Sequence, residues 1–124
     1  MLRCKYKYKY SCDIRNHLIY ITFNVEFAIN CNIDMYDRIV IATPTWWDTM
    51  APAILTLLSN INLEGKEVVL VQTHAGWPGS CLEDMEKLCK GANIISKKDI
   101  QFDSNGGPEM ITPIENLNTW ISSL

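Results

Sequence analysis

The sequence lacks a long uninterrupted apolar run, and this absence argues against a membrane-spanning helix. A span needs about 20 consecutive apolar residues, whereas the most apolar N-terminal stretch, residues 18–30, is interrupted by Asn24 and Glu26. No small-residue cleavage site follows this stretch, so we do not expect a secretory signal peptide. The sequence therefore predicts a protein with no membrane partner.

The cysteines lack the spacing of a disulfide framework or of a zinc site. The chain has five of them, an odd number, and no CxxC pair. Such a pattern argues against both a disulfide-rich secreted domain and a thiolate metal centre. We expect reduced thiols, a cytoplasmic location and no bound metal.

The larger part of the chain also lacks the positive charge that nucleic-acid binding requires. The net charge is −3, divided into about +2 for residues 1–35 and about −5 for residues 36–124. Acidic surfaces repel phosphates, so we expect no nucleic-acid partner. The simpler interpretation of the basic residues in 1–35 is a solvated edge, and the alternative is an anion-binding patch.

The composition that remains is that of an ordinary globular domain. The chain has 124 residues, of which 48% are hydrophobic and 20% charged, which is enough for one core. Residues 1–35 stand apart because lysines alternate with tyrosines over residues 5–10 and apolar residues recur at alternate positions over residues 19–29. This alternation predicts an atypical strand-forming segment at residues 1–35, followed by an α/β domain at residues 36–124.

Three strands are predicted in the second region. Residues 39–43 and 68–71 are continuous β-branched runs, typical of strands covered on both faces of a parallel sheet. Residues 93–95 and 97–102 read as a third strand with a bulge near Ser96.

Helices are predicted between and after these strands. Pro52 suits a first helical turn, and apolar residues follow it at helical spacing. Ser80 with Glu83, and Thr112 with Glu115, have the spacing of capping boxes that open two further helices. The alternation of strand and helix predicts an α/β sheet with right-handed crossovers.

The candidate binding site lies in two loops at the carboxyl ends of the first two strands, where open α/β sheets bind ligands. Its predicted residues are Thr43, Pro44, Thr45, Trp46, Trp47, Asp48 and Thr49 in the first loop, and Thr73, His74, Ala75, Gly76 and Trp77 in the second. Adjacent tryptophans cannot both enter one core, and an exposed indole gains by stacking on a flat ring. Gly76 and Gly79 are expected to leave amide groups free for the polar edge of such a ring.

Two simpler interpretations stay open at this point. The tryptophans can merely cap the sheet, and His74 is more simply a residue that contacts ligand or backbone than a general base. No serine or cysteine nucleophile accompanies His74 in a recognisable motif, so no catalytic residue is predicted. Cys81 reads as a small buried thiol rather than a reactive one.

Four segments resemble the C-terminal half to two-thirds of flavodoxin-like proteins, in the order and near the spacing of that family. They are YDRIVIATPTWWDTMAP, INLEGKEVVLVQTHAGWPGS, KLCKGANI and PIENLNTWISSL, and together they cover about residues 33–124. The resemblance implies a flavodoxin-like three-layer α/β sandwich with a mostly parallel sheet. It also implies an FMN cofactor, with residues 44–49 against the isoalloxazine ring and residues 73–76 along its pyrimidine side.

The activity implied is electron transfer by an FMN-binding protein with a redox partner, or a small flavin reductase. The sequence departs from the family in residues 1–35, where nothing matches the Ser/Thr-rich phosphate loop or the first helix. Asp48 also replaces a usual glycine. The alternative is therefore a flavodoxin-derived fragment that binds no flavin and serves as an interaction domain, or a non-functional truncated product.

The N-terminal segment is expected to repair the sheet. Residues 18–29 can lie beside residues 39–43, and the short connection through residues 30–38 predicts an antiparallel pairing with Ile19, Ile21, Phe23, Val25 and Phe27 facing one side. A face of this kind needs cover from a helix or from a second subunit, and the second case would be a homodimer through the N-terminal strand region.

Overall fold

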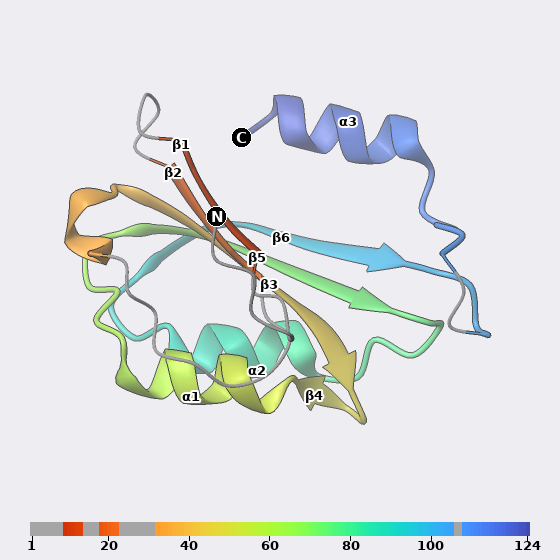
Figure 1. The fold of residues 1–124 in the computed structure, drawn as a ribbon, viewed down its shortest axis with the longest axis horizontal. Coiled ribbons are helices and arrows are strands. Elements are labelled where there is room, and N and C mark those ends of the chain that lie inside the picture. The colour runs from red at the N-terminus through yellow and green to blue at the C-terminus, as the bar shows by residue number, and fades with distance from the viewer. Residues whose placement is uncertain (1–8, 14–17, 23–31, 106–107) are drawn as a thin grey trace.

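A mostly parallel β-sheet forms the centre of the computed structural model, which describes residues 9–13, 18–22, 32–105 and 108–124 (Figure 1). The sheet order is β1-β2-β3-β5-β6. The strands are β1 (Lys9–Asp13), β2 (Leu18–Thr22), β3 (Arg38–Trp46), β5 (Glu67–His74) and β6 (Asn93–Gln101). Strands β2, β3, β5 and β6 are parallel, and β1 pairs antiparallel with β2 at the edge.

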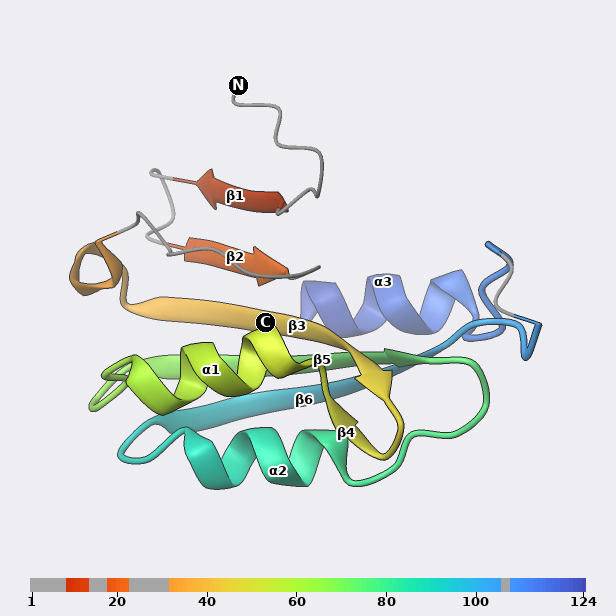
Figure 2. The same cartoon turned by 60° about the horizontal axis from the view of Figure 1, so that its bottom comes forward.

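The helices lie on both faces of this sheet. Figure 2 shows α1 (Pro52–Asn60) and α2 (Cys81–Leu88) on one face and α3 (Ile114–Ser122) on the other. A short 3-10 helix, η1 (Ile33–Met35), precedes β3, and the two-residue strand β4 (Thr49–Met50) folds back antiparallel on the end of β3. The fold is thus α/β with an open sheet. No helix among the described residues is long and apolar enough to cross a bilayer.

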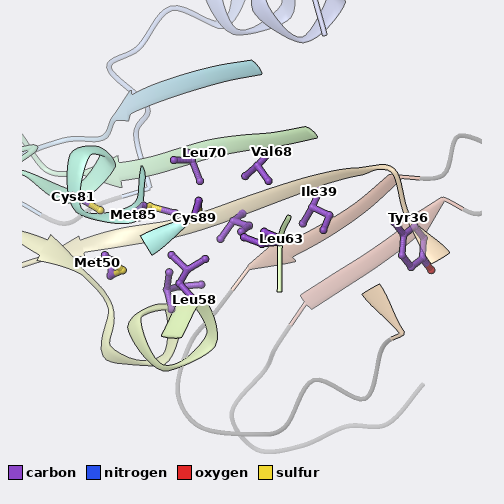
Figure 3. Close-up of a cluster of buried hydrophobic side chains, with 12 residues drawn as sticks. Tyr36, Ile39, Met50, Leu58, Leu63, Val68, Leu70, Cys81, Met85 and Cys89 are labelled. Carbon is purple, nitrogen blue, oxygen red and sulfur yellow. The ribbon is translucent and has the colours of Figure 1, made fainter. Parts of the chain in front are cut away.

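The core lies mainly between the sheet and the first two helices. Alternate residues of β3 serve the two faces: Ile39 and Ile41 pack toward α1 and α2, whereas Val40 packs on the side of α3. Leu70 and Met85 join the first cluster without any exposed surface (Figure 3). The prediction that these strands are covered on both faces is confirmed.

The predicted bulge in the last strand is also confirmed. Val68 pairs with Ile94 and Val69 with Ser96, so Ile95 is the extra residue. After the bulge the register continues to the pair of His74 with Gln101. The shift decides which residues of β6 lie beside the end of β5.

The predicted direction of the N-terminal strand is wrong. β2 does lie beside β3, but the two strands are parallel, with Ile19 paired to Ile39 and Ile21 to Ile41. The prediction assumed a strand reaching to residue 29, whereas β2 ends at Thr22. Residues 23–37 then connect the strands, and a parallel crossover needs about a dozen. Phe23, Val25 and Phe27 lie outside the described residues.

Neither capping box forms the predicted hydrogen bonds, although Ser80 is the N-cap of α2 as predicted and α3 begins one residue later than predicted. Ser80 occupies the N-cap of α2, but its hydroxyl donates to Asp84 instead of capping the backbone. Thr112 lies before Pro113, the N-cap of α3, and its hydroxyl accepts the Gln101 amide at 2.8 Å. The Ser80 hydroxyl thus binds a side chain of its own helix, and the Thr112 hydroxyl binds the end of β6.

Candidate functional site

The first tryptophan-bearing segment is a tight hairpin rather than a loop. β3 continues through Trp46, so residues 43–46 are strand, and only Trp47 and Asp48 form the turn before β4. Trp46 pairs with Thr49 across this turn. Trp46 is 39% exposed and Trp47 is 95% exposed. The hairpin therefore holds one indole almost wholly in solvent.

The turn places backbone strain on Trp47. Its φ is +60°, and among the described residues it is the one non-glycine residue with positive φ. A positive φ within a two-residue hairpin turn favours glycine at that position. An L-residue in this region costs about 1–2 kcal/mol. Strain of this kind tends to persist where function requires it.

The second tryptophan-bearing segment crosses to the hairpin and contacts it at Asp48. The Ser80 amide donates to the Asp48 carbonyl at 2.7 Å, and the Trp77 indole N–H donates to Asp48 Oδ1 at 2.5 Å. A Cβ on Gly79 would lie 2.2 Å from the Asp48 carbonyl oxygen. The two segments thus meet, and Gly79 is required where their backbones come closest.

The predicted site residues divide into three groups by exposure. Trp46, Trp47, Asp48, Ala75, Gly76 and Trp77 are exposed, whereas Thr43 and His74 are buried and Pro44, Thr45, Thr49 and Thr73 are intermediate. Thr43 accepts the Ala51 amide at 3.1 Å, so it supports the hairpin. We call Trp46, Trp47, Asp48 and Trp77 the tryptophan edge.

His74 connects the second tryptophan-bearing segment to β6. Its Nδ1 accepts the Gly76 amide at 3.0 Å, and its Nε2 lies 2.9 Å from Asp99 Oδ1. Because Nδ1 accepts, the neutral ring carries its proton on Nε2 and donates it to Asp99. The prediction that His74 contacts backbone is confirmed. The prediction of a free Gly76 amide is wrong, because His74 already binds it.

Asp99 is the residue that the sequence interpretation missed. Its carboxylate also accepts a hydrogen bond from Gln72 Nε2 at 2.7 Å. Asp99 lies opposite Gln72 only because the bulge shifts the register of β6. An aspartate following a strand bulge was the available signal, but the pairing register was needed to use it.

Asp84 joins the hairpin to α2. Its carboxylate accepts hydrogen bonds from Lys87 Nζ at 2.9 Å, from the Ser80 hydroxyl at 2.7 Å and from the Thr49 hydroxyl at 2.9 Å. These donors, Lys87 foremost, lower the pKa of Asp84 to about 2. Asp84 is therefore ionised at neutral pH.

Cys81 is not a reactive thiol. It is completely buried in the first turn of α2, and burial raises its pKa to about 11. The thiolate is the nucleophilic form, so this cysteine packs rather than reacts. The interpretation of Cys81 as a small buried thiol is confirmed.

Comparison of the chain with models of known protein families, with curated proteins and with solved structures gives no significant match. We therefore infer the function from the geometry of the tryptophan edge.

Proposed function

We propose that the tryptophan edge binds the ring of a flavin, and that the protein is a flavodoxin-like electron carrier or small flavin reductase. The observation that carries the proposal is Trp47, whose indole is 95% exposed on a backbone with φ of +60°. Folding gains nothing from an indole in water, and the strained turn opposes folding. A stacked flat ring would bury this indole and add about 0.5–1.5 kcal/mol of ring attraction.

The position of the edge supports the same proposal. Both tryptophan-bearing segments leave the carboxyl ends of adjacent parallel strands, β3 and β5. This is the edge at which open α/β sheets bind ligands. The sheet order, with β2 beside β3, is compatible with the resemblance described above. The FMN phosphate would need a site other than the family's loop.

A second candidate is an interaction domain without flavin. The hydrogen bond from Trp77 to Asp48 and the contact of Gly79 with the Asp48 backbone favour it, because they join the two segments directly. Exposed tryptophans are also common centres of protein interfaces. A ring on Trp47 nevertheless requires no rearrangement of this contact, since that indole points into solvent.

The deciding experiment is a flavin titration of purified protein, followed by flavin fluorescence. We expect saturable binding of riboflavin and FMN, weakened about tenfold in Trp47→Ala, which corresponds to about 1.4 kcal/mol. Trp46→Ala is expected to have a smaller effect because Trp46 is less exposed. Trp120→Phe is the matched control, since Trp120 lies on α3 at the opposite face and bonds Ser96.

If the wild-type protein binds no flavin, the interaction domain replaces the first proposal. If flavin binds but neither hairpin variant changes its affinity, the ring lies elsewhere and the assignment to the tryptophan edge is wrong.

A further inference from the structure

The described part of the molecule is electrically polarised along its strands. The segments that meet at the carboxyl edge of β3, β5 and β6 are residues 43–50, 73–84, 99–105 and 108–115, and they contain no lysine or arginine. Basic residues lie at the other end, where Arg38 begins β3 and Lys66 precedes β5, and inside β6, where Lys97 and Lys98 come directly before Asp99. The tryptophan edge therefore lies in the acidic half of the described structure.

Two carboxylates contact the tryptophan-bearing segments directly. Asp48 accepts the Trp77 indole proton, and no described cation forms an ion pair with it. Asp84 binds the Thr49 hydroxyl and is held ionised, with Lys87 as its partner. A negatively charged group placed near these side chains is repelled by Asp48, whose charge no described ion pair compensates, whereas Lys87 compensates the charge of Asp84.

The helix terminus near this edge does not reverse that balance. A helix N-terminus attracts anions through its free amides and its dipole. In α2 the Ser80 amide already binds the Asp48 carbonyl, and the first turn carries Glu83 and Asp84. Near the carboxyl edge, the described strands supply Lys9, at register with Thr22 on β2 and separated from β5 by β3. Lys98 on β6 lies at register with Val71, and its ammonium group is over the Trp120 ring on the face that α3 covers.

We propose that the tryptophan edge selects planar rings that carry no negative charge, so that riboflavin is preferred to FMN. This inference rests on the proposed function, because it concerns which flavin the same site accepts. Riboflavin and FMN share one ring and differ by a phosphate, which carries about −1.5 to −2 charges at neutral pH. The ring stacks equally in both, and the phosphate meets the acidic edge only in FMN.

The test compares the two dissociation constants at low and high salt. At low ionic strength we expect riboflavin to bind roughly fivefold more tightly than FMN, from unscreened repulsion over several ångströms. At about 1 M salt the Debye length falls to about 3 Å, and the two affinities should become equal. Any effect of salt on stacking cancels in the ratio because the ring is the same.

Asp48→Asn sharpens the test. The asparagine oxygen can still accept the Trp77 indole proton, so the contact of the two segments is kept while one charge is removed. We expect the low-salt preference for riboflavin to fall about twofold. Glu64→Gln, an exposed change at the amino end of β5, is the charge-matched control and should leave the preference unchanged.

Equal or tighter binding of FMN at low salt would overturn the inference while leaving ring binding intact, and would indicate an anion site near the edge. A preference for riboflavin that persists at high salt, or that Asp48→Asn does not reduce, would overturn the electrostatic cause. Failure of both flavins to bind would instead overturn the proposed function, and this inference with it.

Discussion

The interior beside α1 and α2 and the tryptophan edge use large apolar residues in opposite ways. Ile39, Leu70 and Met85 are completely buried on regular strands and helices. Trp47 is almost fully exposed on a turn that favours glycine. Burial of the first three side chains stabilises the fold by about 25 cal/mol per Å² of apolar surface. The Trp47 side chain gains no such burial, and its backbone strain destabilises the fold. Ile39, Leu70 and Met85 therefore stabilise the fold, whereas the stability of the fold gives no reason for a tryptophan at position 47.

The largest expected effect on stability comes from the interior. Leu70→Ala should lower the free energy of unfolding by about 3 kcal/mol, because it removes buried contacts and leaves a cavity between the sheet and the helices. Denaturant unfolding measures this value. Flavin affinity of the folded fraction should stay unchanged, since Leu70 is not part of the tryptophan edge. A loss below about 1 kcal/mol would contradict the described packing.

An intermediate effect is expected at the contact of the two edge segments. Gly79→Ala places a methyl group 2.2 Å from the Asp48 carbonyl oxygen, so one backbone must move. Gly65→Ala is the matched control, because Gly65 also has positive φ, at +75°, but nothing lies within 4 Å of its Cβ. Each substitution incurs the cost of about 1–2 kcal/mol for positive φ. Gly79→Ala should cost about 1 kcal/mol more, from overpacking.

Thermal and denaturant unfolding of the two alanine variants give this difference. Equal losses of stability would show that Gly79 does not separate the two backbones as described. A downfield indole proton signal from Trp77 should also weaken in Gly79→Ala and persist in Gly65→Ala.

The smallest effect on stability, and of opposite sign, is expected at Trp47. Asparagine tolerates positive φ better than a bulky residue, so Trp47→Asn should keep the turn and raise the free energy of unfolding by up to about 1 kcal/mol. The same variant should lose ring binding. Destabilisation by more than about 1 kcal/mol would mean that the indole supports the fold, and the contrast between interior and edge would fail.

Local pattern was sufficient to predict the regular elements of residues 36–124. Unbroken β-branched runs identified β3 and β5, and Pro52 marked the start of α1. These signals act within a few residues, through side-chain burial and the fixed φ of proline. The bulge near Ser96 was predicted from a local signal too, the break between the two strand-like stretches 93–95 and 97–102.

Contacts between distant residues could not be predicted in the same way. The capping boxes had the correct spacing, yet Ser80 binds Asp84 and Thr112 binds the Gln101 amide. Hydroxyl groups choose among several nearby partners of similar energy, and sequence spacing does not rank them. His74 was recognised as a backbone contact, but its partner Asp99 depended on a register set by the bulge.

The sequence by itself determined that two adjacent tryptophans follow a buried strand, that a second glycine-containing segment with a tryptophan follows the next strand, and that the surrounding segments lack lysine and arginine. The tertiary structure decided that β2 runs parallel to β3, that Trp47 has a positive φ, and that Asp48 accepts the Trp77 indole proton. Composition and the periodic pattern of apolar residues are local properties of the chain. Strand direction, turn strain and the partner of a carboxylate depend on where distant backbone is placed, which no short stretch of sequence specifies.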